Sequence, residues 1–161
     1  MEKMLRGKRV ILISHCILNQ NAVIRGWERA VGAYNDVVRI LLDHDIGIIQ
    51  MPCPEFTWQG ESRPSRTKQE YNTDQYRSHC RKLAEGVAAQ IREYRTHGYQ
   101  IAGLIGVRES PTCDTETEKG IYMEELLRIF EKEGIRVDAM DIPEDYLEGN
   151  GGMFLEKLKK L

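Results

Sequence analysis

The sequence predicts an α/β fold: a single-domain Rossmann-like sheet, mostly parallel, with helices on both faces. Three short apolar runs rich in β-branched residues have the length of strands covered on both faces, and they begin at Arg9, Asp45 and Gln100. Segments with apolar residues at helical spacing separate these runs, which is the order of parallel β-α-β units. The 161 residues, 41% of them hydrophobic, suffice for one core with two covered faces. We therefore expect one domain over residues 1–161.

The first half of the chain is organised around residues 9–21, RVILISHCILNQN. This stretch starts as a buried strand and turns polar at Ser14, His15 and Cys16. Next we expect a loop or short helix start over 19–29, a helix over 31–44 and a strand over 45–51, which Pro52 and Pro54 end. Residues 55–72 contain glycine, proline and charge without a sustained period, which favours an ordered functional loop.

The second half continues the alternation of strands and helices. Asn72 or Thr73 can cap a helix that runs to about Thr96, and Gly98 ends it. The remaining elements are expected to be a strand over 100–107, a loop over 108–117, a helix over 120–133, a strand over 135–140 and a short terminal helix after Pro143. Right-handed crossovers place the carboxyl ends of parallel strands at one edge of the sheet, where ligands bind in open α/β folds.

The charge balance and the amino terminus argue against two classes of partner. Lys plus Arg number 23 against 25 Asp plus Glu, a net charge of −2 without the basic excess that a nucleic-acid backbone requires. The apolar run near the amino terminus stops after about five residues, well short of a signal-peptide core or a membrane span. We expect a cytoplasmic protein whose four cysteines are reduced and available for metal or catalytic chemistry.

Three of the four cysteines directly follow a predicted strand: Cys16, Cys53 and Cys113. A single cysteine at such a place is usually a small buried hydrophobe, but three at one edge of a sheet indicate a shared metal or cluster site. Three thiolates are one fewer than iron-sulfur clusters or structural zinc commonly take, so a cluster here has an open iron that can bind substrate. His15 is a candidate fourth ligand, although in a strand its side chain faces away from that of Cys16. Cys80 lies inside the long helix and is expected to be structural.

Two polar side chains near the predicted ligands are candidates for catalysis. Glu55 follows Cys53 by two residues and could act as a general acid or base, or form only a surface salt bridge. Ser110 places a hydroxyl three residues before Cys113. The arginines nearby could supply positive charge to an anionic substrate or to sulfide, or lie at the surface, and the tryptophans could pack on loops. The side chains whose place in the pocket is open are His15, Arg63, Arg66, Arg108, Trp27 and Trp58.

Four short motifs occur in an order known from one protein family. They are residues 13–18 (ISHCIL), residues 53–55 (CPE), residues 64–66 (PSR) with Glu70, and residues 109–113 (ESPTC). In order and strand context they resemble the successive motifs of the thiouracil desulfurase family, formerly a domain of unknown function. The resemblance extends over roughly residues 9–115.

The resemblance implies a Rossmann-type fold with a 4Fe-4S cluster on three cysteines, whose free iron takes sulfur from a thiolated pyrimidine. Carried over by position, the cluster ligands would be Cys16, Cys53 and Cys113, and the catalytic groups would be Glu55 and Ser110.

The loops around these motifs depart from the family pattern. Family members commonly carry a second cysteine and an Arg-Tyr-Asp-Gly run after the first ligand, where residues 22–26 here read AVIRG. They have Gly-Gly-Leu after Cys-Pro-Glu, where residues 56–60 read FTWQG, and glycine after the third ligand, where Asp114 stands. The chain therefore resembles a shorter, related branch of desulfidases, and cluster chemistry carries over better than substrate identity.

Two functions follow from these patterns. The first is an iron-sulfur enzyme that removes sulfur from a small thiolated, thiouracil-like compound at the open iron of a three-cysteine cluster. The alternative is a non-catalytic nucleotide-binding or metal- or redox-sensing α/β module whose thiols hold zinc or stay free. Protein purified anaerobically should be brown in the first case and colourless in the second, whereas aerobic preparation can lose the cluster.

Overall fold

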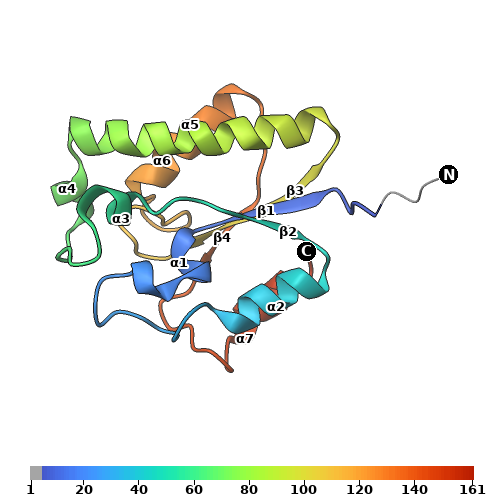
Figure 1. The fold of residues 1–161 in the computed structure, drawn as a ribbon, viewed down its shortest axis with the longest axis horizontal. Helices are drawn as coiled ribbons and strands as arrows, with labels where there is room; N and C mark the ends of the chain where they lie inside the picture. The colour runs from blue at the N-terminus through green and yellow to red at the C-terminus, as the bar shows by residue number, and fades with distance from the viewer. Residues whose placement is uncertain (1–4) are drawn as a thin grey trace.

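The fold is built on a four-stranded sheet, which the computed structural model describes within residues 5–161. The strands are β1 (Arg9–Ile13), β2 (Gly47–Gln50), β3 (Gln100–Val107) and β4 (Ala139–Ile142), in the spatial order β2-β1-β3-β4 (Figure 1). All three neighbouring pairs are parallel. The predicted α/β class is therefore confirmed, and the sheet is wholly rather than mostly parallel.

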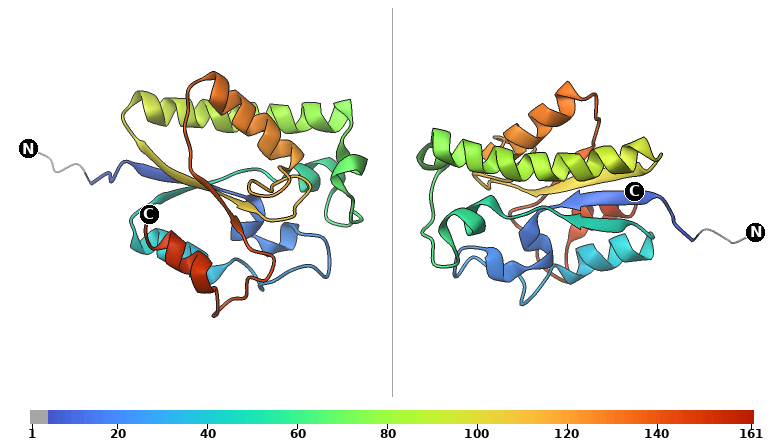
Figure 2. Two further views of the ribbon diagram at one scale, coloured as in Figure 1. Left: turned by 180° about the vertical axis from the view of Figure 1, so that it is seen from behind. Right: turned by 45° about the horizontal axis from the view of Figure 1, so that its top comes forward.

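Helices cover both faces of the sheet, as predicted. They are α1 (His15–Leu18), α2 (Asn35–Asp43), α3 (Pro54–Gln59), α4 (Lys68–Tyr71), α5 (Asp74–Thr96), α6 (Ile121–Lys132) and α7 (Gly152–Leu158), and a short 3-10 helix spans Gln20–Ala22. Figure 2 shows α5 and α6 on one side of the sheet and α2 and α7 on the other. The molecule thus has three layers, with the shorter helices gathered beyond the strand ends (Figure 1).

The alternation of side chains along β1 produces two cores. Leu12 packs with residues of α5 and α6, whereas Ile11 and Ile13 pack with residues of α2 and α7. Successive side chains of a strand point to opposite faces, so a continuous apolar run fills both cores. Cys80, on α5, is fully buried in the first core, which confirms its predicted structural place.

Several predicted element boundaries were wrong. The expected loop over 55–72 contains α3 and α4, because local capping stabilises helices too short to show a hydrophobic period. Thr67 and Glu70 form a reciprocal capping box at α4. The helix expected over 31–44 begins at Asn35, and Val31 is fully exposed. The strand expected over 135–140 is the later β4.

The order of the strands creates a crevice at one edge of the sheet. From β1 the chain moves outward to β2 and then returns past β1 to β3, so consecutive connections diverge on either side of β1. In doubly wound sheets this switch point, outside the carboxyl ends of the strands, is where ligands bind.

None of the helices within residues 5–161 combines the length and apolar character needed to cross a membrane.

Candidate functional site

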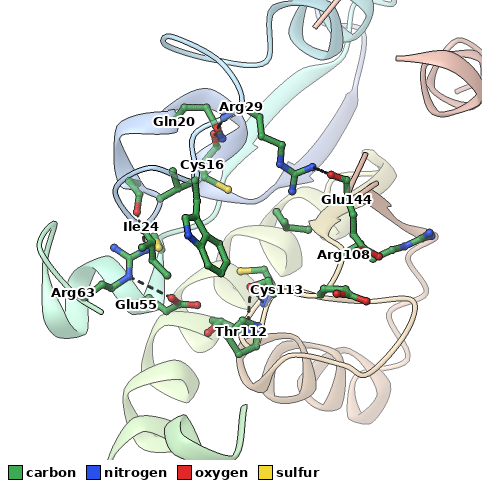
Figure 3. A pocket seen from close by; sticks show the side chains of 18 of the residues that line it. Cys16, Gln20, Ile24, Arg29, Glu55, Arg63, Arg108, Thr112, Cys113 and Glu144 are labelled. Carbon is green, nitrogen blue, oxygen red and sulfur yellow. Dashed lines mark hydrogen bonds and ion pairs between the residues drawn. The ribbon is translucent and has the colours of Figure 1, made fainter. Parts of the chain in front are cut away.

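A cavity of about 300 Å³ opens at the carboxyl ends of β1, β2 and β3. Its volume lies at the lower end of the range for small-molecule sites, roughly 300–1,000 Å³. Figure 3 shows the sulfur atoms of Cys16 and Cys113 and the carboxylate of Glu55 directed toward the same space. All five residues predicted for the site line this cavity: Cys16, Cys53, Glu55, Ser110 and Cys113.

Cys16 is placed by a helix that starts directly after β1. The expectation of a strand at His15 was wrong, because His15 is the first residue of α1. The buried side chain of Gln20 holds this turn, donating from Nε2 to the Cys16 carbonyl oxygen at 2.8 Å. Its Oε1 accepts the backbone N–H of Arg29 at 2.8 Å. One amide therefore joins the Cys16 turn to the loop that follows it.

Cys53 is placed by the start of the next helix. It is the N-cap of α3, and its Sγ accepts the backbone N–H of Phe56 at 3.4 Å. Pro54 occupies the first helical position, where its fixed φ is already helical and its missing N–H leaves no donor unpaired. The proline that ends β2's apolar run in the sequence thus also starts the helix that presents the thiol.

Cys113 lies in a loop that is held by hydrogen bonds to its own backbone groups. The Ser110 hydroxyl oxygen accepts the N–H of Thr112 at 3.2 Å and that of Cys113 at 3.0 Å. The N–H of Val107 donates to the Cys113 carbonyl oxygen at 3.0 Å. A Cβ at Gly106 would lie 2.3 Å from that oxygen, so only glycine permits this close approach. Ser110 therefore shapes the loop, and its hydroxyl proton remains available to a ligand in the cavity.

Asp114, directly after Cys113, stabilises the same loop through hydrogen bonds to its backbone. Asp114 is fully buried and accepts the backbone N–H groups of Glu109 at 2.7 Å and of Glu116 and Thr117 at 2.9 Å each, as well as the Thr117 hydroxyl. Burial raises the pKa of Asp114, but the hydrogen bonds outweigh it and hold the pKa below its usual value. The loop conformation is thereby tied to a carboxylate that the cavity does not reach.

The three cavity thiols lie close enough to affect one another. Burial raises the pKa of Cys16 to about 12, and the neighbouring Cys53 adds to the shift. Burial also raises the pKa of Cys53. For Cys113, burial and the other two thiols raise the pKa well above its ordinary value. Without a bound group the thiols are protonated at neutral pH, so binding a soft metal here releases protons.

Glu55 is buried at the wall of the cavity. Its carboxylate is part of an internal ion pair with Arg63, Nε to Oε1 at 3.3 Å, and accepts the Tyr71 hydroxyl at 3.2 Å. Arg63 also donates to the Ala22 carbonyl oxygen at 2.8 Å. The sequence left open a salt bridge at the surface. Glu55 does form a salt bridge, but both of its partners are buried, so that alternative was wrong about the location.

The other candidate side chains divide into two groups. Three of them line the cavity: Trp27, Arg63 and Arg108. Its lining, as described for residues 5–161, does not include His15, Arg66 or Trp58. Trp58 instead packs edge-on against Tyr76, with 5.9 Å between ring centroids. Arg108 forms an ion pair with Glu116.

Sequence reasoning missed the contribution of the segment after β4. Arg29 donates from Nη1 to the carbonyl oxygens of Pro143 at 2.6 Å and Glu144 at 2.8 Å, and both Arg29 and Glu144 line the cavity (Figure 3). These partners lie more than a hundred positions apart, and no local pattern signals such a contact.

The donor set bears on what the cavity could hold. Within residues 5–161, no group of three or more His, Cys, Asp or Glu side chains is arranged to hold a metal ion. A single zinc ion requires thiolate sulfurs about 2.3 Å from one centre. A 4Fe-4S cluster makes a different demand, because each thiolate binds a different iron. Three thiols from three strand ends around one cavity fit a cluster with one iron free of protein ligands.

Comparisons with known proteins identify a relative but no activity. The uncharacterized protein MJ0003 of Methanocaldococcus jannaschii is 43% identical over 157 residues, which covers 98% of this chain and 99% of the relative. No family model matches the sequence, and no solved structure matches it.

Proposed function

We propose that this chain, which belongs to the family of the uncharacterized protein MJ0003, is an iron-sulfur-dependent desulfurase for a small thiolated compound. The observation that carries the proposal is the convergence of Cys16, Cys53 and Cys113 on one cavity at the switch point of the sheet. The resemblance of the surrounding motifs to the thiouracil desulfurase family supports it. We also propose a cytoplasmic location, where four free thiols stay reduced.

The three cysteines would hold a 4Fe-4S cluster. When bound, such a cluster supplies one iron without a protein ligand, a Lewis acid with affinity for the sulfur of a thiolated substrate. The thiols deliver their protons to solvent on loading, because each ligand must be a thiolate.

The cavity lining favours a small substrate without a phosphate group. Its three arginines, Arg29, Arg63 and Arg108, all donate to or pair with oxygen atoms of the protein. Apolar side chains supply much of the remaining wall; they are Ala22, Val23, Ile24, Trp27, Val107 and Pro111. A planar thiolated ring, thiouracil-like in size, suits such a wall better than a thiolated nucleotide.

Glu55 and Ser110 are proposed to handle protons in the cavity. The Glu55 carboxylate is held in place by Arg63 and Tyr71, and it faces the space where the substrate would lie (Figure 3). From there it can exchange a proton with a water or with the departing sulfur. Ser110 accepts two backbone N–H groups and keeps one O–H to orient the substrate.

Iron and acid-labile sulfide content after anaerobic reconstitution tests the proposal. The parent protein should bind both and turn brown. Cys16→Ser, Cys53→Ser and Cys113→Ser should each lose assembly, because two soft ligands no longer chelate the cluster. Cys80→Ser is the matched control, since this thiol lies in the core away from the cavity, and it should assemble normally. Equal iron retention in all four variants would overturn the ligand assignment, and a colourless parent would favour the zinc or free-thiol module.

A further inference from the structure

Ser14, which follows β1, does not cap the helix that starts after it. Ser14 is the N-cap of α1, yet its side chain makes no capping hydrogen bond. An N-cap hydroxyl normally accepts an N–H from the first turn and stabilises the helix. The Ser14 side chain is instead turned inward, and the residue is only 2% exposed.

The buried Ser14 hydroxyl is left without a partner. Among residues 5–161, its Oγ has no atom at hydrogen-bonding distance and angle. Leaving a buried polar group unsatisfied costs about 1–3 kcal/mol, so such groups in native proteins call for an explanation. A cap at this position would have avoided the cost, because the N–H groups of α1 are adjacent.

The Ser14 side chain points to the same face of the sheet as that of Leu12, two residues earlier, and Cys113 packs against the core to which Leu12 belongs. Consistent with this placement, burial raises the pKa of the Cys113 thiol, and the Ser14 hydroxyl acts against that larger rise by lowering it. A protonated thiol is a weak acceptor, whereas a thiolate that binds metal carries negative charge and accepts hydrogen bonds well. Cys113 belongs to the loop after β3, and the backbone N–H of Ser14 donates to Ile105 of the same strand at 3.0 Å. The hydroxyl therefore lies at the end of β1, and the sulfur lies in the loop that follows the neighbouring strand β3.

We propose that Ser14 is a positioning residue whose hydroxyl donates a hydrogen bond to the sulfur of Cys113 once that sulfur is a cluster ligand. The inference rests on the proposed function, because it assigns Ser14 a partner that exists only in the loaded protein. A hydrogen bond to a ligand sulfur stabilises the more negative, reduced cluster and raises its reduction potential. Within residues 5–161 the cavity lining does not include Ser14, so the residue would tune the cluster without touching the substrate.

The test compares the reduction potential of the reconstituted cluster in the parent, Ser14→Ala and Ser14→Thr, by spectroelectrochemical titration. Ser14→Ala should assemble a cluster with a lower potential than that of the parent, and Ser14→Thr, which keeps the hydroxyl, should restore it. Ser78→Ala, an exposed position on α5, should leave the potential unchanged. In the metal-free protein, Ser14→Ala should be at least as stable as the parent in urea, because it removes an unsatisfied group.

The outcomes separate this inference from the proposed function. A parent that loads iron and sulfide and a Ser14→Ala variant with the same potential would overturn the role of Ser14 and leave the desulfurase proposal standing. A Ser14→Ala variant that fails to load while Ser14→Thr loads supports the role, since only the hydroxyl differs in function. A parent that binds no iron overturns both.

Discussion

Glu55 and Asp114 are both buried carboxylates placed just after a proposed ligand, but their surroundings are opposite. Glu55, two residues after Cys53, lines the cavity and is held by side chains from other segments, Arg63 and Tyr71. Asp114, directly after Cys113, is fully enclosed, and it accepts its hydrogen bonds from its own loop.

The difference shows that proximity to a ligand in the sequence does not assign a role to an acidic residue. The role depends on which groups the carboxylate oxygens contact. The Glu55 carboxylate is held by Arg63 and Tyr71 and still faces the cavity. The Asp114 oxygens accept hydrogen bonds from backbone N–H groups and a threonine hydroxyl of their own loop. We therefore expect substitutions at Glu55 to affect chemistry and substitutions at Asp114 to affect structure.

The largest expected effect is on activity at Glu55. Glu55→Gln keeps an oxygen that can accept from Arg63 and Tyr71 but cannot exchange a proton, so the cluster spectrum should persist while desulfuration falls by roughly 10²–10⁴-fold, as for a lost general acid or base. The loss of absorbance of a thiolated pyrimidine measures the rate. Glu85→Gln, exposed on α5, should keep the parent rate. If Glu55→Gln desulfurates at the rate of the parent protein, Glu55 has no role in proton transfer and only forms its ion pair.

The next largest effect concerns the cation that holds Glu55. Arg63→Met leaves a buried carboxylate without its partner, which should cost about 3–5 kcal/mol of unfolding free energy in urea. Arg39→Met, exposed on α2, is the matched control and should cost little. Adding Glu55→Gln to Arg63→Met removes the stranded charge, so the double variant should recover part of the loss. If both single arginine variants cost the same, the ion pair contributes nothing to stability.

The sequence predicted those parts of the molecule that depend on local pattern. The strand expected over 100–107 matches β3 at both ends, because its apolar run is bounded by polar residues. The three cavity thiols were identified because each follows such a run. The short helices α3 and α4 were missed, because capping rather than periodicity defines them.

The rest of the site could not be predicted because it depends on contacts between distant segments. Arg29 reaches the carbonyl groups after β4, and Arg63 reaches both Glu55 and the 3-10 helix. The scaffolding role of Asp114 had a weak local signal, since an Asp side chain often accepts the backbone N–H two residues on, as Asp114 does from Glu116. That signal does not distinguish a turn from a surface loop.

A smaller effect is expected from the close approach behind Cys113. Gly106→Ala would place a methyl group 2.3 Å from the Cys113 carbonyl oxygen and 2.5 Å from Asp141, so the loop must shift. Overpacking of this kind costs about 1–3 kcal/mol, and it should also weaken iron retention. Gly86→Ala, in the middle of α5 with nothing within 4 Å, should stabilise the protein by about 0.5–1 kcal/mol. Equal stability in the two variants would contradict the tight packing of this loop.

The effect expected at Asp114 is similar in size at pH 7, but it falls away in acid. Asp114→Asn replaces one accepting oxygen with a donor that faces backbone N–H groups, which should cost about 1–3 kcal/mol at pH 7. Because the folded pKa of Asp114 lies below its usual value, its charge stabilises the folded state above the unfolded pKa, about 3.9, and this contribution is lost as pH falls through the folded pKa. The difference in unfolding free energy between parent and variant should therefore narrow below about pH 4. Asp43→Asn, exposed at the end of α2, should show no difference at any pH. A gap at Asp114 that stays constant into acid would mean that hydrogen-bond geometry, and not the charge, holds the Cys113 loop.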